Sequence, residues 1–486
     1  MLHKHASLIF FLGFAALMVV SHLPLLGMPF HWDELGQFVP TALDLYRDGS
    51  WVTHTALPNV HPPGVAAILA VSWHIFGFSI VSARVTMLLV AALGVLFTFL
   101  VAIRLGRGSM GAPAFAAAAF LMAAPLFFAQ SMLVLLDMPA MTFTMLALLL
   151  FLDGRYAWCA VACCALVLMK ETAITTPMIF AVWLWFREKR RVETMYFLAP
   201  AVTLGIWLLV LHHVTGYWTG NADFAKYNVN DAMSLEHLVG SAGRRLFFLF
   251  VSDGNFIGSV ALLAFWRELR GKQWAVAFLV GGAQLLFVTV FGGAILDRYV
   301  LPVIPIVYVA MAVAGSAYPR AWRMTTQIAM LALLVTGWFL NPPYPFPYEN
   351  NLAMTDFVAL QKEAAGYLEA TAPNARIASV WPFYDAVTHP EFGYVTKPLK
   401  TVRLQGYMLP DIASVPRSDY DFLVMFSRSW SGEGTIFDWG PFGWVFRRYF
   451  SWNPQATDEE LRAGAGLVRI ANLTRHGLWI KIYVPE

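Results

Sequence analysis

Long apolar runs, separated by short polar connections, fill the first two thirds of the chain. The runs cover approximately residues 8–28, 79–103, 111–130, 132–152, 156–170, 172–186, 194–214, 244–265, 274–295, 299–317 and 324–341. Most of them approach the roughly 20 residues that an α-helix needs to cross a bilayer. The pattern therefore predicts an α-helical polytopic membrane protein with about 11 transmembrane helices.

The first apolar run follows His3-Lys4-His5 and has the layout of a signal peptide. It is long enough to span the membrane, however, and no small-residue cleavage site follows it. We interpret it as the first transmembrane helix, with the N-terminus in the cytoplasm. An odd number of spans then places the tail from Asn341 onward outside.

The distribution of cations supports this topology, because loops on the cytoplasmic side collect Lys and Arg. Alternate connections do so, for example at Arg104 and Arg107 and again from Arg187 to Arg191. Six cations fall on the predicted outer side instead: Arg47, Lys170, Lys226, Arg244, Arg245 and Arg298. These exceptions mark places where an anionic group could bind.

Composition agrees with a membrane protein and excludes other classes. Hydrophobic residues make up 58% of the chain and charged residues 13%, and the mean hydropathy is +0.60. The net charge of +3 is dispersed, without the basic stripe of a nucleic-acid-binding protein. Cys159, Cys163 and Cys164 share one apolar run, so we expect them to pack as small hydrophobic residues rather than bind a metal.

The first outer loop, residues 29–78, is too long for a turn. Residues 38–46 have a helical apolar stripe, and a second apolar segment after His61-Pro62-Pro63-Gly64 is too short to span, so we expect both to lie along the membrane surface. Because His61 precedes two prolines, it either simply marks a helix start or is held there for function.

After Asn341 the composition becomes mixed polar. A helix is predicted at about 354–370 and strands at about 376–381, 420–426, 466–473 and 478–484. We expect the aromatic stretch 441–446 to be a core strand. The predicted domains are a transmembrane domain, residues 1–341, which includes loop 29–78, and a small extracytoplasmic α/β domain, residues 342–486.

Charged residues beside or within the apolar runs are the candidates for chemistry. Asp33 and Glu34 follow the first span, and Asp137 is expected about two turns into the fourth. A carboxylate at that depth is costly unless it faces a polar cavity or a cation. It therefore indicates a functional site.

Two further pairs leave alternatives open. Lys170 and Glu171 interrupt an uncharged run, where they either satisfy each other at a turn or bind an anionic headgroup. Asp297 and Arg298 either neutralise each other or leave Arg298 as a bidentate donor to phosphate, while Tyr299 suits an aromatic belt.

Five motifs resemble those of the GT-C superfamily of membrane glycosyltransferases, both in their order along the chain and in their predicted side of the membrane. They are Asp33-Glu34, His61-Pro62-Pro63, Leu136-Asp137-Met138-Pro139, Lys170-Glu171-Thr172 and Arg298-Tyr299-Val300-Leu301-Pro302. Within the superfamily, the chain is most similar to bacterial relatives of the protein O-mannosyltransferases and the lipid A aminoarabinose transferases. The resemblance covers about residues 1–341.

The resemblance implies transfer of a hexosyl or pentosyl unit, with inversion, from a polyprenyl-phosphate donor to an acceptor hydroxyl outside the bacterial cytoplasmic membrane. Asp33 would be the general base with Glu34 as its partner. His61, Asp137, Lys170, Glu171, Arg298 and Tyr299 would bind substrate. Many relatives have lysine where this chain has His61, which weakens phosphate binding there. The acceptor is left open between lipid, glycan and protein, and some relatives hold a divalent metal cation near the first-loop acids.

The main alternative is a transporter or lipid-sugar flippase, in which buried charges line a translocation path. Such a protein should carry ionisable or broken positions near the midplane of several spans, together with an internal repeat. Here the charges gather at one face and the halves are dissimilar. A non-catalytic membrane scaffold would leave Asp137 and Lys170 unexplained.

Overall fold

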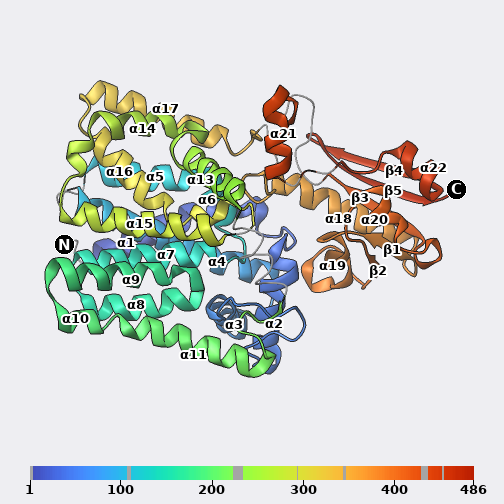
Figure 1. Ribbon diagram of the computed structural model, residues 1–486, viewed down its shortest axis with the longest axis horizontal. Helices are drawn as coiled ribbons and strands as arrows, with labels where there is room; N and C mark the ends of the chain where they lie inside the picture. The colour runs from blue at the N-terminus through green and yellow to red at the C-terminus, as the bar shows by residue number, and fades with distance from the viewer. Residues whose placement is uncertain are drawn as a thin grey trace. The chain divides into compact units, whose positions relative to one another are not determined.

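The computed structural model describes residues 4–106, 111–222, 234–292, 294–342, 346–427, 436–450, 452 and 454–486 (Figure 1). The chain forms two compact units. The first comprises Met1–Leu26 and Phe38–Leu340, and the second comprises Gly27–Gln37 and Asn341–Glu486. A short piece of the first predicted outer loop thus belongs to the second unit.

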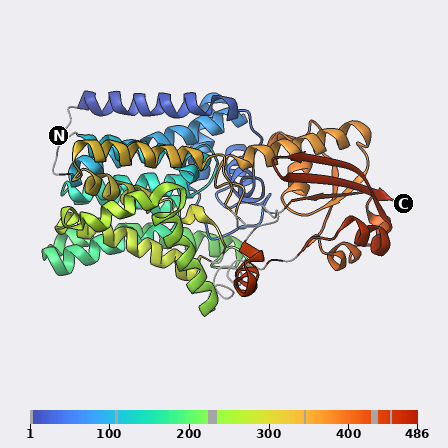
Figure 2. The same ribbon diagram turned by 90° about the horizontal axis from the view of Figure 1, so that it is seen from above.

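The first unit is helical, and in Figures 1 and 2 most of its helices run roughly parallel to one another. Its helices are α1 Lys4–His22, α2 Val39–Asp48, α3 Gly64–Phe76, α4 Ile80–Leu105, α5 Ala112–Ala123, α6 Pro125–Gln130, α7 Asp137–Leu152, α8 Tyr156–Met169, α9 Thr175–Val182, α10 Arg191–Met195, α11 Leu198–Thr215, α13 Leu235–Phe250, α14 Asn255–Ala264, α15 Lys272–Phe291, α16 Ile304–Gly315 and α17 Arg320–Thr336. The predicted helices in loop 29–78 are confirmed as α2 and α3.

The described helices have the apolar composition of a multi-pass membrane protein. Four are long and apolar enough to cross a bilayer, or five if the bent pair α13–α14 counts as one span, and five more apolar helices have 10–17 residues. The expected count of about 11 is not confirmed. One predicted span, 111–130, is divided between α5 and α6 at Pro125, whose ring disfavours helical conformation in the residue before it.

The prediction that Asp137 lies two turns into a helix is wrong. Asp137 is the first residue of α7, and residues 131–136 before it are not helical. An acidic side chain is favourable at this end of the helix dipole, and Pro139 fits the first turn because its missing N–H would have no partner there. The carboxylate therefore sits at the end of a helix.

The second unit contains helix α18, Ala353–Thr371, and a five-stranded sheet. The strands are β1 Arg376–Ser379, β2 Lys400–Arg403, β3 Phe422–Phe426, β4 Leu467–Arg475 and β5 Leu478–Pro485, in the order β2-β1-β3-β5-β4. β1 is parallel to β2 and β3, whereas β5 is antiparallel to β3 and β4. The helix and four predicted strands are confirmed.

Two features of this unit differ from prediction. Strand β2 was missed, because its four residues are half-buried or exposed and carry no apolar alternation. The stretch expected as a core strand lies instead in helix α21, Gly440–Tyr449, where Trp444 is 64% exposed. Pro441 at the first turn and the spacing of Trp444 and Arg448 on one face suit a helix.

Candidate functional site

Three charged side chains from separate elements meet in the first unit. Lys170 Nζ lies 2.5 Å from Asp137 Oδ1, and Arg298 Nε lies 3.3 Å from Asp137 Oδ2. Their exposures are 5%, 3% and 4% for Lys170, Asp137 and Arg298. One buried carboxylate therefore faces two buried cations.

Breaks in the helices at one end of the unit place these groups. Lys170 follows the last residue of α8 and has extended backbone, and Arg298 lies in the 3₁₀ turn η9, Asp297–Val300, between α15 and α16. Lys170 Nζ also lies 4.3 Å from the centre of the Tyr299 ring, a cation–π contact. The Lys170, Arg298 and Tyr299 side chains thus meet at the start of α7.

A second ion pair adjoins the first. Arg244 from α13 pairs with Asp297, and both side chains are buried. Arg245 borders the same place: a Cβ on Gly292 would lie 3.0 Å from Arg245 Nη2 and 3.2 Å from Tyr299 Cδ2. We call Lys170, Arg244, Arg245 and Arg298 the cation cluster.

The cation cluster unites four of the six cations that sequence assigned to the outer side. Arg244 and Arg245 were missed as site residues, although their predicted sidedness was the signal that could have found them. Arg47 is exposed on α2, and Lys226 lies outside the described residues. Asp137 and Asp297 are carboxylate partners within this group of cations.

His61 and Glu171 form another contact across the unit, with His61 Nδ1 2.8 Å from Glu171 Oε2. Close packing of α3 on α8 places them, since a Cβ on Gly64 would lie only 2.4 Å from the Leu168 carbonyl oxygen. Glu171 therefore hydrogen-bonds to His61 while its neighbour Lys170 hydrogen-bonds to Asp137.

A small, partly open cleft lies beside this contact. His61, Asn59 and Thr41 provide polar atoms in its lining, and Trp51 and Trp207 provide aromatic surface. Leu136, the neighbour of Asp137, also lines it. A concave, mainly apolar surface with a few polar groups is typical of a ligand site.

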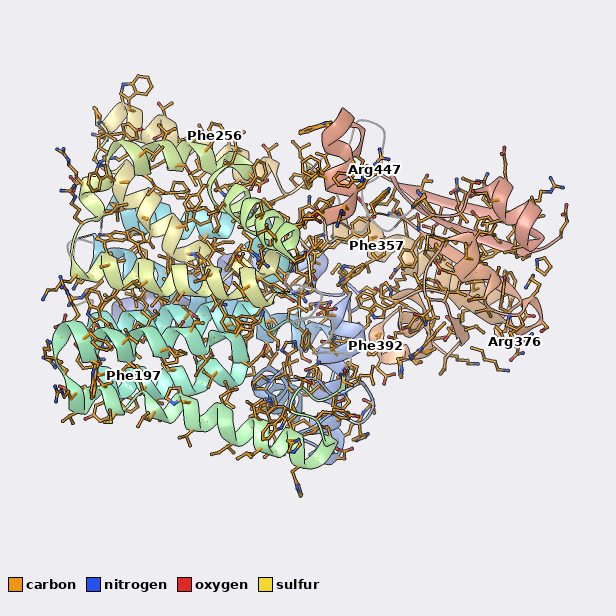
Figure 3. The ribbon with its side chains drawn as sticks, viewed as in Figure 1. Phe197, Phe256, Phe357, Arg376, Phe392 and Arg447 are labelled. Carbon is orange, nitrogen blue, oxygen red and sulfur yellow. The ribbon has the colours of Figure 1, made fainter. Side chains whose placement is uncertain are left out.

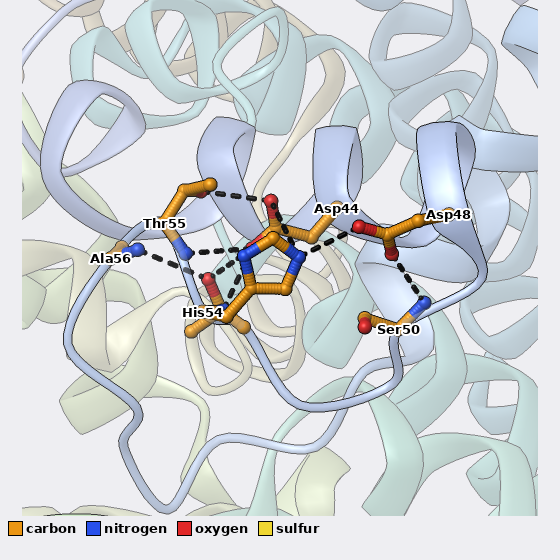
Figure 4. A network of polar contacts seen from close by, with 7 residues as sticks. Asp44, Asp48, Ser50, His54, Thr55 and Ala56 are labelled. Carbon is orange, nitrogen blue, oxygen red and sulfur yellow. Dashed lines mark hydrogen bonds and ion pairs between the residues drawn. The ribbon is translucent and has the colours of Figure 1, made fainter.

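Asp44 binds the loop that carries Thr53, one of the residues that line the cleft (Figure 4). Its carboxylate accepts hydrogen bonds from Thr53 Oγ1 at 2.7 Å, His54 N at 2.9 Å, and Thr55 N and Oγ1 at 3.1 and 2.9 Å. Burial opposes ionisation of Asp44, but these hydrogen bonds outweigh it and lower the pKa of the carboxyl below its usual 3.8.

The two first-loop acids lie in the second unit and differ in their environments. Glu34 is fully buried, and its Oε2 accepts a hydrogen bond from His31 N at 2.7 Å. Asp33 is partly exposed. Trp32 before it has a φ of 55°, an unusual value for a bulky residue, and such strain concentrates at functional sites.

The described residues do not favour a metal ion near these acids. They contain no group of three or more His, Cys, Asp or Glu side chains arranged to hold one. One oxygen of Glu34 is also engaged by the loop's own backbone.

These features define a multi-pass membrane protein with a buried cationic site and a smaller α/β unit. Among solved structures, the chain is similar to ArnT from Cupriavidus metallidurans bound to undecaprenyl phosphate, with 12% identity, a TM-score of 0.58 and coverage of 99% of this chain and 98% of that one. The apo ArnT structure gives 13% identity and a TM-score of 0.57, covering 97% of this chain and 98% of that one.

The chain is also similar to the archaeal oligosaccharyltransferase AglB from Archaeoglobus fulgidus in complex with an inhibitory peptide and a dolichol-phosphate. That match has 12% identity and a TM-score of 0.50 and covers 87% of this chain and 69% of that one. Searches of family models and of curated proteins found no match. The chain thus shares its fold with the ArnT and AglB structures.

Proposed function

We propose that this protein is a GT-C glycosyltransferase that moves a hexosyl or pentosyl unit from a polyprenyl-phosphate donor to an acceptor hydroxyl, with inversion. The reaction takes place outside the bacterial cytoplasmic membrane, with the N-terminus in the cytoplasm and the α/β domain outside. The observation that carries the proposal is the buried cation cluster around Asp137.

The cation cluster is suited to the donor phosphate. Arginine offers a planar fork that binds phosphate in a bidentate manner, and lysine adds a point charge. Both act strongly here because Lys170 and Arg298 are shielded from water. The ArnT structure of the same fold is bound to undecaprenyl phosphate, which accords with this assignment.

Asp33 is the proposed base. Its carboxylate takes the proton of the acceptor hydroxyl while that oxygen attacks the anomeric carbon, and the bond from this carbon to the phosphate oxygen breaks. The phosphate leaves with the bonding electrons, and the cation cluster stabilises its negative charge. Glu34, which hydrogen-bonds to His31 N, shapes the loop that presents Asp33.

The remaining predicted residues have supporting roles. Asp137 keeps Lys170 and Arg298 together when donor is absent, and Tyr299 lies against Lys170. His61 lines the cleft and is held by Glu171, and both are proposed to bind the donor near its phosphate.

The test uses the purified protein with radiolabelled polyprenyl-phosphate sugars and a lipid and protein extract. We expect label to leave the donor and to appear in an acceptor, and Asp33→Asn to abolish the transfer. Asp153→Asn, which alters an ion pair with Arg104 in the same unit, is the matched control and should retain activity. Movement of intact donor across proteoliposomes without transfer would instead support the flippase alternative.

A further inference from the structure

Residues 131–136, between α6 and α7, form a buried segment that is not helical. None of the six is more than 3% exposed. Buried backbone N–H and C=O groups need hydrogen-bond partners, and an irregular segment does not supply them as a regular helix does. The conformation of this segment therefore depends on side chains that reach it from other elements.

Arg84 on α4 is such a side chain. Its Nη1 donates to the Met132 carbonyl oxygen at 3.1 Å. Arg84 is 0% exposed and is among the largest fully buried side chains of the described residues. An arginine buried in a membrane unit is costly and is a candidate for a functional role. Arg84 thus connects α4 to the segment that precedes α7.

The segment leads directly into the candidate site. It ends at Leu136, which lines the cleft. The next residue is Asp137, whose carboxylate contacts two members of the cation cluster. The hydrogen bond from Arg84 therefore fixes the chain just before the carboxylate on which these cations converge.

The rest of α7 is held against α4 by other contacts. Thr142 Oγ1 donates to the Val90 carbonyl oxygen at 3.0 Å. A Cβ on Gly94 would lie 2.5 Å from Met141 Cε and 2.7 Å from Thr142 Oγ1, so the two helices pack closely there. Loss of the Arg84 bond should therefore loosen the segment and the first turn of α7 without separating α7 from α4.

We infer that Arg84 is a positioning residue for the donor phosphate. It holds the segment so that Asp137 keeps Lys170 and Arg298 in place to receive phosphate. When such an arrangement is only partly populated, the apparent affinity for the ligand falls by that fraction, whereas saturating ligand restores the arrangement. This inference rests on the proposed function, because it concerns the donor site of the same reaction.

The test compares two arginines of the same helix. Arg104, near the other end of α4, donates from Nη2 to the carbonyl oxygen of Leu152, the last residue of α7, also at 3.1 Å. Arg84→Met and Arg104→Met each remove an arginine bond to a backbone carbonyl, but only the first acts on the segment before Asp137.

The full-length proteins are titrated with undecaprenyl phosphate in detergent while Tm is measured. We expect Arg84→Met to need about tenfold more undecaprenyl phosphate for a fixed rise in Tm, because it loses a hydrogen bond made in a shielded place. Arg104→Met should match the wild type.

Kinetics separate positioning from folding. With labelled polyprenyl-phosphate sugar and acceptor extract, Arg84→Met should raise the donor KM about tenfold and change kcat by less than about twofold. Arg84→Lys keeps the charge and a donor, so its donor KM should fall between those of Arg84→Met and the wild type. A residue needed only for folding would leave the donor KM of the folded protein unchanged.

Equal undecaprenyl phosphate requirements in Arg84→Met and the wild type, or an equal increase in Arg104→Met, would overturn the inference. A wild type that undecaprenyl phosphate does not stabilise would overturn it as well. If Arg84→Met does not fold, Arg84→Lys is judged by the same comparison. Stabilisation that depends on Arg84, without transfer from any labelled donor, would leave the positioning role standing and reject the proposed transfer chemistry.

Discussion

At the residue scale, Asp137 is the carboxylate between two cations that are almost fully buried. Its removal leaves Lys170 and Arg298 close together in a shielded environment. We predict that Asp137→Ala lowers the free energy of unfolding by about 3–5 kcal/mol, as expected when one partner of a buried ion pair is lost. Thermal unfolding of the purified protein in detergent measures the change.

The same variant also probes the ligand. If the cation cluster binds phosphate, added undecaprenyl phosphate should raise the melting temperature of Asp137→Ala more than that of the wild type, because it replaces the missing negative charge. Asp153→Asn is the control: its partner Arg104 is 44% exposed, so the loss should be about 0–1 kcal/mol. Equal shifts in all three proteins would argue against phosphate at the cluster.

Asp33 and Glu34 are adjacent but should respond differently to amide substitution. We predict that Asp33→Asn abolishes transfer and changes stability less than Glu34→Gln does, because Asp33 is partly exposed whereas Glu34 is fully buried. Glu34→Gln should cost about 1.5–3 kcal/mol, because it weakens a buried charge-assisted hydrogen bond to His31 N, while transfer is only reduced. Equal loss of transfer in both variants, with both folded, would contradict this division.

The charged residues that meet in the first unit could be singled out from sequence, but their pairing could not. Lys170 and Glu171 are neighbours, yet the first hydrogen-bonds to Asp137 and the second to His61. Arg298 likewise pairs with Asp137, while its neighbour Asp297 pairs with Arg244. Where the chain turns between helices, adjacent side chains point to different elements, and only tertiary packing decides their partners.

At the element scale, helix α21 corrects a strand prediction. A core strand at this position would bury its aromatic residues, whereas Trp444 is 64% exposed. Trp444→Ala should therefore change the free energy of unfolding by no more than about 0.5 kcal/mol. Phe357→Ala, at a fully buried position of α18 labelled in Figure 3, should cost about 3–5 kcal/mol. A large loss for Trp444→Ala would restore the core-strand interpretation.

The loop after α2 offers a pH test. The pKa of Asp44 is lowered in the folded protein, so the stability it contributes is complete above its usual pKa of 3.8 and is lost as the pH falls toward the lower folded value. We predict that protease cleavage within residues 49–60 rises below about pH 4 in the wild type. Asp44→Asn should be cleaved similarly across this range, because amide nitrogen does not titrate. A wild-type profile that matches the variant would reject this role.

At the scale of the whole molecule, hydrophobic periodicity was sufficient to predict several apolar helices followed by a small C-terminal sheet. It could not assign segment Gly27–Gln37 to the second unit, because this depends on contacts such as Phe30 with Phe392 and Trp32 with Trp381, more than 300 positions apart. It also overstated helix continuity, since local breaks such as that before Pro125 are set by backbone constraints rather than hydropathy.

Segment Gly27–Gln37 lies between two parts of the first unit in the sequence but folds with the second unit. We predict that cutting the full chain at a protease site inserted between Leu340 and Asn341 leaves the two pieces associated. The N-terminal piece still carries Phe30 and Trp32, which are fixed in the second unit by two hydrogen bonds and an aromatic contact.

Co-purification through a tag on the N-terminal piece checks this prediction. The double substitution Phe30→Ala and Trp32→Ala should release the C-terminal piece after cutting, because it removes the buried Phe30 side chain and the contact with Trp381. The exposed Leu57→Ala is the control and should retain it. Release of the wild-type piece would mean that these contacts are too weak to hold the loop that presents Asp33, and that the covalent connection at residue 341 is needed to keep it in place.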